Sequence, residues 1–200
     1  SCTLVIFMAE VKVLIEGYAR EKEGYYEASS SAVLIKDSDK KIIVDPGGNE
    51  ELLLSALKKE GLTPNDIDMI FLTHYHPDHI INIRLFPGKD ILDGDIIYRG
   101  DKEFEFKGKI PGTEIELIET PGHAYEQVTP LIKTDHGIIA IAEDLWWWED
   151  GKQKTDKEGL LSLEDPFVKD KDALRKSREL ILAKADYIIP GHGKMFKVEK

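Results

Sequence analysis

Five of the six histidines in this 200-residue chain lie in three short segments, each directly after an apolar stretch. The densest segment is Thr73-His74-Tyr75-His76-Pro77-Asp78-His79. In extended backbone the side chains of residues i and i+2 point the same way, so His74 and His76 can bind one metal ion through two nitrogens. Pro77 resists further extension, so Asp78 and His79 can turn at the start of a helix and face a second position nearby. The spacing predicts half of a two-metal site.

Two metal ions need more ligands than one loop provides, and the later histidines can supply them. His123 lies in Thr120-Pro121-Gly122-His123 and His192 in Pro190-Gly191-His192-Gly193, two tight turns that let the backbone approach a site closely. Asp144 follows 137–143, which is expected to be a buried strand, and a carboxylate at its end can bridge two cations. His136 is expected in an exposed turn, outside the site. These ligands predict two divalent metal ions, with zinc the first choice and iron or manganese the alternatives.

This set of side chains resembles that of the metallo-β-lactamase fold hydrolases, whose His-x-His-x-Asp-His motif, later histidine, bridging aspartate and final histidine occur here in the same order. The resemblance covers residues from about 10 to 200 and is closest to a small, free-standing subgroup found in animals and archaea. It implies one metal ion on His74, His76 and His123, a second on Asp78, His79 and His192, and a bridge through Asp144. It also implies that Asp45 orients a ligand imidazole through a hydrogen bond.

The chain also departs from the family pattern. Ile80-Ile81 stands where the family usually has x-Gly after its Asp-His, and Glu143 stands where a glycine usually precedes the bridging aspartate. After His123 the chain has Ala124-Tyr125-Glu126 instead of the common Thr-Pro-Gly. The metal ligands are kept through these changes, whereas the substrate contacts of better-known relatives cannot be transferred.

Two divalent ions lower the pKa of a bridging water towards neutrality and polarise a carbonyl or phosphoryl oxygen. Together with the resemblance, this chemistry predicts a hydrolase in which a metal-bridging hydroxide attacks a small ester, thioester or lactone, as in glyoxalase II-like relatives. Asp78 is the expected catalytic residue, because it can orient the attacking hydroxide. The alternative is a phosphodiesterase or RNA nuclease with the same metals. A redox enzyme and a non-catalytic scaffold are two further classes to weigh.

Aromatic residues near the ligands are the candidates for substrate contact. Tyr25 and Tyr26 belong to the segment 18–30, which is expected to be a flap or an ordinary exposed connection at the site end of the fold. Tyr75 lies inside the ligand loop and either reaches the substrate or covers the metals. At least one of the three consecutive tryptophans 146–148 is expected at the pocket rim, with Trp146 as the candidate for substrate contact; the alternative is that they pack the loop and flank the next helix.

The elements that must position these residues follow from apolar periodicity. The first half predicts strands over 10–17, 31–36, 41–44 and 68–73, with a helix from the capping Asn49 to about Lys59. The second half predicts strands over 114–119, 128–134, 138–142 and 187–189, with a helix over 171–184. This order predicts an α+β chain folded as a four-layer αββα sandwich, with a single domain over 10–200 after an N-terminal extension, 1–9, that need not be ordered.

Composition limits the partners. The formal charge of −11 disfavours nucleic acid as a partner, although residues 169–200 are locally basic, with a net charge of +4. Cys2 is the only cysteine and no apolar run approaches a membrane span, so we expect a cytoplasmic protein without a membrane partner. The expected partner is a small-molecule substrate, and a homodimer is left open.

Overall fold

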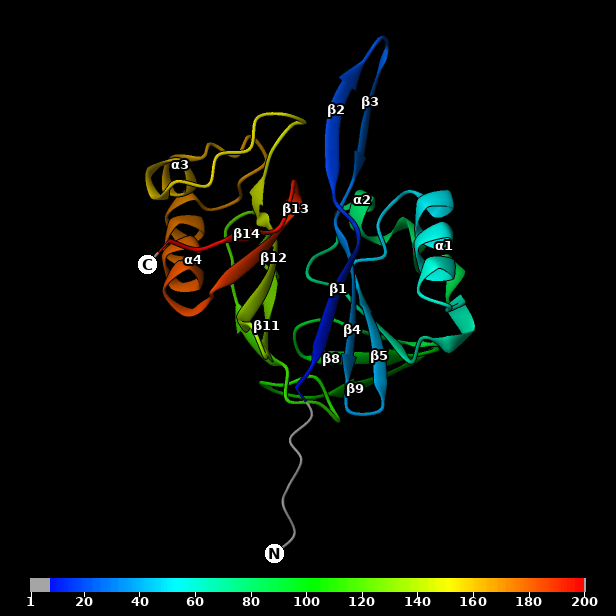
Figure 1. The fold of residues 1–200 in the computed structure, drawn as a ribbon. Helices are drawn as coiled ribbons and strands as arrows, with labels where there is room; N and C mark the ends of the chain where they lie inside the picture. Colours follow the sequence, from blue (N-terminus) through cyan, green and yellow to red (C-terminus); the bar gives the residue numbers. More distant parts are fainter. Residues whose placement is uncertain (1–7, 200) are drawn as a thin grey trace, which may run out of the picture.

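The computed structural model describes residues 8–199, in which two β-sheets pack face to face with a helical layer outside each (Figure 1). The expected four-layer αββα sandwich is therefore confirmed. Residues 1–7 of the expected extension lie outside the described residues. Within residues 8–199, every helix is too short or too polar to cross a membrane.

The first sheet has seven strands, β1 (Glu10–Ile15), β4 (Ala32–Asp37), β5 (Lys40–Val44), β6 (Met69–Phe71), β7 (Asp90–Leu92), β8 (Ile96–Arg99) and β9 (Lys102–Glu105), in that spatial order. Its outer face carries α1 (Glu50–Lys59) and the 3-10 helix η1 (Pro64–Asp66) follows. The side chain of Asn49 caps α1 by accepting a hydrogen bond from the backbone N–H of Leu52, as the sequence predicts. Strand periodicity then separates two cores: Val33 and Ile35 face the other sheet, whereas Leu34 faces α1.

The second sheet has five strands, β10 (Glu116–Glu119), β11 (Val128–Thr134), β12 (Gly137–Trp147), β13 (Tyr187–His192) and β14 (Phe196–Lys197). Its outer face is covered by α3 (Lys157–Ser162) and α4 (Lys171–Lys184) (Figure 1). Ile139 and Ile141 of β12 point into the core between the sheets, and Ala140 packs towards Ile181 of α4. β12 and β13 run parallel, so the segments after Ala142 and Ile189 lie at the same edge of the sandwich.

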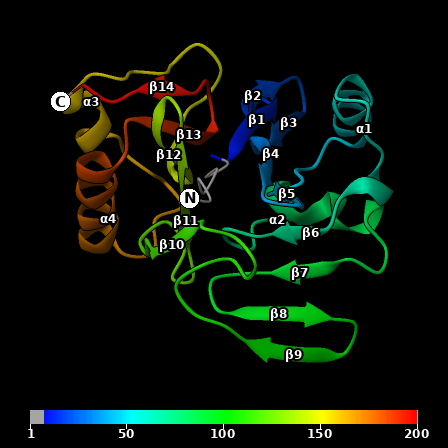
Figure 2. The same ribbon diagram turned by 60° about the horizontal axis from the view of Figure 1, so that its bottom comes forward.

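Several elements of the structure were not expected from the sequence. The segment 18–30 forms a hairpin of β2 (Tyr18–Lys22) and β3 (Tyr25–Ser29), which projects beyond the sandwich at the top of Figure 1. Strands β7 to β9 extend the first sheet beside β6, as Figure 2 shows. The short helix α3 precedes α4.

Candidate metal centre

The ligand loop begins where β6 ends. Backbone at His76 is extended (φ −66°, ψ 141°), and Pro77 then starts the short helix α2 (Pro77–Ile80), which leads into the 3-10 helix η2 (Ile81–Leu85). Proline suits the first helical position because its φ is already helical and no N–H is needed there. The predicted change from extended loop to helix is therefore present, and His79 follows it with its ring centroid 4.2 Å from that of His74.

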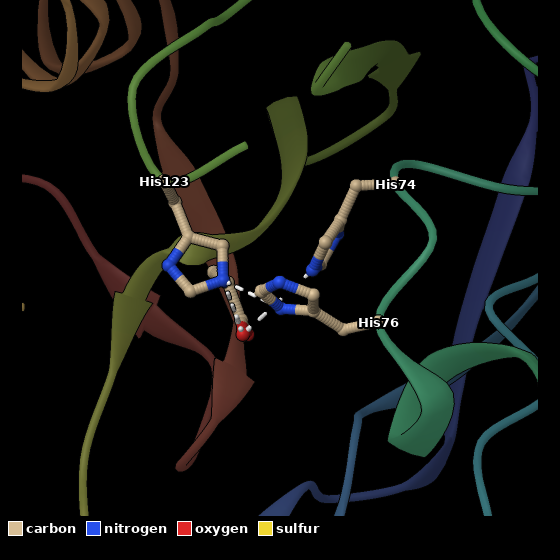
Figure 3. A group of neighbouring side chains, drawn as sticks. His74, His76 and His123 are labelled. Carbon is tan, nitrogen blue, oxygen red and sulfur yellow. Dashed lines mark hydrogen bonds and ion pairs between the residues drawn. The ribbon is translucent and has the colours of Figure 1, made fainter. Parts of the chain in front are cut away.

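One group of ligand atoms belongs to His74, His76, His123 and Asp144, and all of them lie within 4.8 Å of one another. Figure 3 shows the three imidazoles converging from the ligand loop and from the opposite sheet. His123 Nε2 lies 2.9 Å from His76 Nδ1 and 3.2 Å from Asp144 Oδ2. His74 Nε2 lies 3.9 Å from the same carboxylate oxygen.

A second group belongs to Asp78, His79 and His192, again within 4.8 Å. His192 Nε2 lies 3.1 Å from Asp78 Oδ2, and His79 Nε2 lies 3.3 Å from Asp144 Oδ1. Asp144 thus presents Oδ2 to the first group and Oδ1 to the second. The structure brings together all seven residues that the sequence singled out as metal ligands, in the two sets expected.

Further hydrogen bonds fix the orientation of the imidazoles. His79 Nδ1 contacts Asp45 Oδ2 at 2.8 Å, His123 Nδ1 contacts Asp165 Oδ2 at 2.6 Å, and His192 Nδ1 contacts the Tyr18 carbonyl at 2.8 Å. In each case Nδ1 can donate its proton in the hydrogen bond, which leaves a lone pair on Nε2 directed at the cluster. Asp45 stands where the resemblance requires an orienting carboxylate, and it also accepts hydrogen bonds from the backbone and hydroxyl of Thr73.

The residues fit divalent metal ions. Three buried atoms at the centre, His74 Nε2, His79 Nε2 and Asp144 Oδ1, have no hydrogen-bond partner among residues 8–199. A buried polar atom without a partner costs about 1–3 kcal/mol, so three of them pointing at one place indicate a ligand that they bind. Imidazole nitrogens and carboxylate oxygens are donors that zinc, iron and manganese accept.

The charges of the cluster are strongly coupled. Burial alone raises the pKa of Asp144, but the imidazoles of His79 and His192 outweigh burial and hold that pKa well below its usual range. Burial lowers the pKa of His74. Burial also opposes protonation of His123, yet its hydrogen bonds to Asp144 and Asp165 raise its pKa to about 9. A metal ion entering the site at neutral pH must therefore displace protons.

Two residues of the centre were not predicted from the sequence to belong to the site. Asp165 is a fully buried acceptor for His123, although 42 positions separate the two in the chain. Glu143 is also fully buried, with φ of 43° and both carboxylate oxygens without a hydrogen-bond partner. The signal for Glu143 was visible, because it occupies a position where glycine is usual. No spacing rule points to Asp165.

The four aromatic candidates for substrate contact differ in position and in exposure to solvent. Tyr25 and Tyr26 are exposed on the β2–β3 hairpin, and Tyr75 is partly exposed with its hydroxyl donating to Asp93. The expectation for Trp146 is wrong: this indole is fully buried and donates to the Leu160 carbonyl. The register of β12 against β13 shifts between Glu143 and Trp147, and Trp147, not Trp146, lies beside His192, with ring centroids 6.0 Å apart.

The sandwich fold and the seven converging ligand side chains define a metal-dependent hydrolase. A model of the Metallo-beta-lactamase superfamily matches residues 25–146. The chain is 32% identical over 201 residues to Metallo-beta-lactamase domain-containing protein 1 of Xenopus laevis, with 95% of this chain and 82% of that protein covered. The protein of the same name in Homo sapiens is 32% identical over 168 residues, and the match covers 78% of this chain and 59% of the human protein. The chain belongs to the metallo-beta-lactamase superfamily.

Solved structures share the fold at low sequence identity. AidC, a dizinc quorum-quenching lactonase, superposes with a TM-score of 0.61 at 19% identity, with 84% of this chain and 74% of AidC covered. The diiron chemotaxis sensor ODP superposes with a TM-score of 0.66 at 17% identity, with 95% of this chain and 86% of ODP covered. Proteins of this fold thus hold zinc in one case and iron in another.

Proposed function

We propose that this chain is a dinuclear metal-dependent hydrolase that acts on a small ester, thioester or lactone. The observation that carries the proposal is the placement of Asp144, whose two carboxylate oxygens face two separate groups of ligand atoms. Zinc is the first choice of metal and iron or manganese the alternatives, because the donor set accepts all three. The dizinc lactonase AidC supports both the metal and the substrate class.

Two metal ions held here would lower the pKa of a bound water and polarise the oxygen of a carbonyl group. His74, His76 and His123 would hold one ion, Asp78, His79 and His192 the other, and Asp144 both. Asp45 and Asp165 keep the imidazoles of His79 and His123 directed at the centre.

Asp78 is the carboxylate of the centre that is best placed to move a proton. Its side chain is 26% exposed, against 6% for Asp144. Burial raises the pKa of Asp78, but the hydrogen bond with His192 and the neighbouring His79 outweigh burial and lower it overall. Asp78 is therefore ionised at neutral pH, and its carboxylate can accept a hydrogen bond from the attacking water and orient it.

A phosphodiesterase or RNA nuclease with the same metals is the second candidate, and the charges of the chain weigh against it. The formal charge is −11, and the basic character of the chain is confined to residues 169–200. On α4, Arg178 is buried and donates to the carbonyls of Leu145 and Leu163, and Arg175 pairs with Glu179 at 3.1 Å, so the two guanidiniums already have acceptors within the chain. A cytoplasmic location and a homodimer stay predictions.

The proposal is tested by metal analysis and turnover on the same sample. We expect close to two equivalents of metal after reconstitution, with hydrolysis of a thioester, a lactone or a 4-nitrophenyl ester faster than that of bis(4-nitrophenyl) phosphate. His76→Ala should lose metal and activity. His136→Ala is the matched control, because His136 is an exposed histidine in the turn before β12 and outside the centre. Turnover of the phosphodiester alone, or equal loss in both variants, would refute the proposal.

A further inference from the structure

An aromatic pair lies beside the second group of metal ligands. The rings of Trp147 and Phe167 have centroids 5.7 Å apart at an angle of 34°, and the rings of Trp147 and His192 meet edge-on with centroids 6.0 Å apart. Phe167 is 58% exposed. An exposed phenylalanine packed against a half-buried tryptophan next to a metal ligand leaves apolar surface in contact with water beside the candidate metal centre.

Hydrogen bonds to Asp165 tie this pair to the metal centre. Asp165 Oδ1 accepts from Trp147 Nε1 at 3.3 Å and from the backbone N–H of Phe167 at 2.9 Å. The other oxygen of the same carboxylate, Oδ2, holds Nδ1 of His123 at 2.6 Å. One buried side chain therefore holds the indole of Trp147, the backbone of Phe167 and the ligand His123, so the place of the pair relative to His123 is set before any substrate binds.

The chemistry of the pair selects the group it can bind. The indole N–H is already used by Asp165, and both oxygens of Asp165 are used in turn. Phe167 is a hydrocarbon side chain. What remains for a ligand is the carbon surface of two rings, which gains free energy by covering methylene groups or a flat apolar ring and disfavours an anionic or strongly hydrated group.

We propose that Trp147 and Phe167 form an apolar subsite for the acyl group of the substrate, so that the preferred substrates are esters or thioesters of medium-length or aromatic acids. This inference rests on the proposed function, which it narrows from any small ester to those with an apolar acyl group. Phe167 is the specificity-determining residue, since it is the more exposed member of the pair and touches no metal ligand in the contacts described above.

The kinetic test uses 4-nitrophenyl acetate, butanoate, hexanoate and octanoate. We expect kcat/KM to rise about twofold to fourfold for each added methylene, until the acyl chain extends beyond the two rings. Phe167→Ala should lower the ratio of hexanoate to acetate kcat/KM about tenfold, and Phe167→Leu should restore part of it. Phe104→Ala is the matched control, because Phe104 is a 43% exposed phenylalanine on β9, the edge strand of the other sheet. It should leave the profile unchanged.

A binding test separates failure of this inference from failure of the proposed function. Straight-chain alkyl hydroxamates, which bind metal ions without being turned over, are titrated into the metal-loaded protein by calorimetry. We expect affinity to rise with chain length in the parent protein and in Phe104→Ala, and much less in Phe167→Ala. If no ester is hydrolysed but this pattern is found, the proposed reaction is wrong and the subsite stands. If affinity is independent of chain length, or falls equally in both variants, the subsite is refuted.

Discussion

Glu143 offers a sharp test of the centre, because the chain accepts backbone strain there. Its φ of 43° lies in the left-handed region, which costs an ordinary residue about 1–2 kcal/mol and glycine nothing. At ordinary positions the order is reversed, and alanine is more stable than glycine by about 0.5–1 kcal/mol. We therefore expect Glu143→Gly to be more stable than Glu143→Ala by about 1 kcal/mol, although both remove the same carboxylate.

Comparing two variants at one position isolates the contribution of the backbone conformation to the free energy of unfolding. Either substitution removes a fully buried carboxylate with no hydrogen-bond partner, and either leaves nearly the same space behind, so these contributions cancel in the difference. The same pair of substitutions at Lys176, an exposed position inside α4, is the control and should show alanine ahead.

The assay is urea unfolding of the metal-free protein, followed by thermal unfolding. For a chain of this length, 1 kcal/mol corresponds to about 2–4 °C in the melting temperature. The reasoning is refuted if Glu143→Ala equals or exceeds Glu143→Gly in stability while Lys176 behaves as expected. Metal analysis of both variants then shows whether Glu143, whose Oε2 lies 3.6 Å from His79 Nδ1, also helps to hold that ligand.

Three further predictions concern the centre. Asp165→Asn replaces the carboxylate that accepts from His123, and we expect about 10–100-fold weaker metal binding in competition with a chromophoric chelator; unchanged affinity would contradict this role. Gly191→Ala places a Cβ 1.7 Å from Asp144 Oδ1, so the bridging carboxylate must move, and metal content per chain should fall while far-ultraviolet circular dichroism is retained. The folded-state pKa of His123 is raised to about 9, so protonated His123 stabilises the metal-free protein fully below pH 6.5, and this stabilisation is lost as pH rises through 9. Over the same pH window the metal affinity should rise, because fewer protons have to be displaced. If stability and metal affinity are both independent of pH, the charge assigned to His123 is wrong.

The sequence predicted the parts of the centre that depend on local pattern. The ligand loop follows a short apolar strand, and Pro77 marks the point where extended backbone becomes helix. His123 lies on a Pro-Gly turn after β10, and parallel pairing of β12 with β13 carries Asp144 and His192 to the same edge. The expected Pro-Gly turn at His192 is wrong, because β13 continues through Pro190 and Gly191 to His192. Periodicity and turn residues are properties of a few neighbouring positions, so they can be read without knowledge of the packing.

The parts that the sequence left out depend on register and on distant contacts. Strict alternation along β12 cannot place the three tryptophans, because the shift in register after Glu143 puts Trp146 in the core and Trp147 at the site. The hairpin over residues 18–29 lacks an apolar run and is joined by cross-strand pairs such as Arg20 with Glu27, at 2.7 Å. Asp165 reaches His123 only after α4 and its preceding loop have packed against β12.

The two sheets contribute differently to the centre. The ligand loop, which follows β6 of the first sheet, supplies three imidazoles and Asp78. The second sheet and its loops supply His123, Asp144, His192 and Trp147, and the loop between α3 and α4 supplies Phe167. The apolar core between the sheets sets their separation, and the buried ligand atoms without hydrogen-bond partners lie at one end of that core. The unpaired atoms come from both sheets, so the free-energy cost of burying them destabilises the contact between the sheets. Metal binding would remove this cost. The centre therefore ties the two halves of the sandwich together at the same place where the proposed reaction occurs.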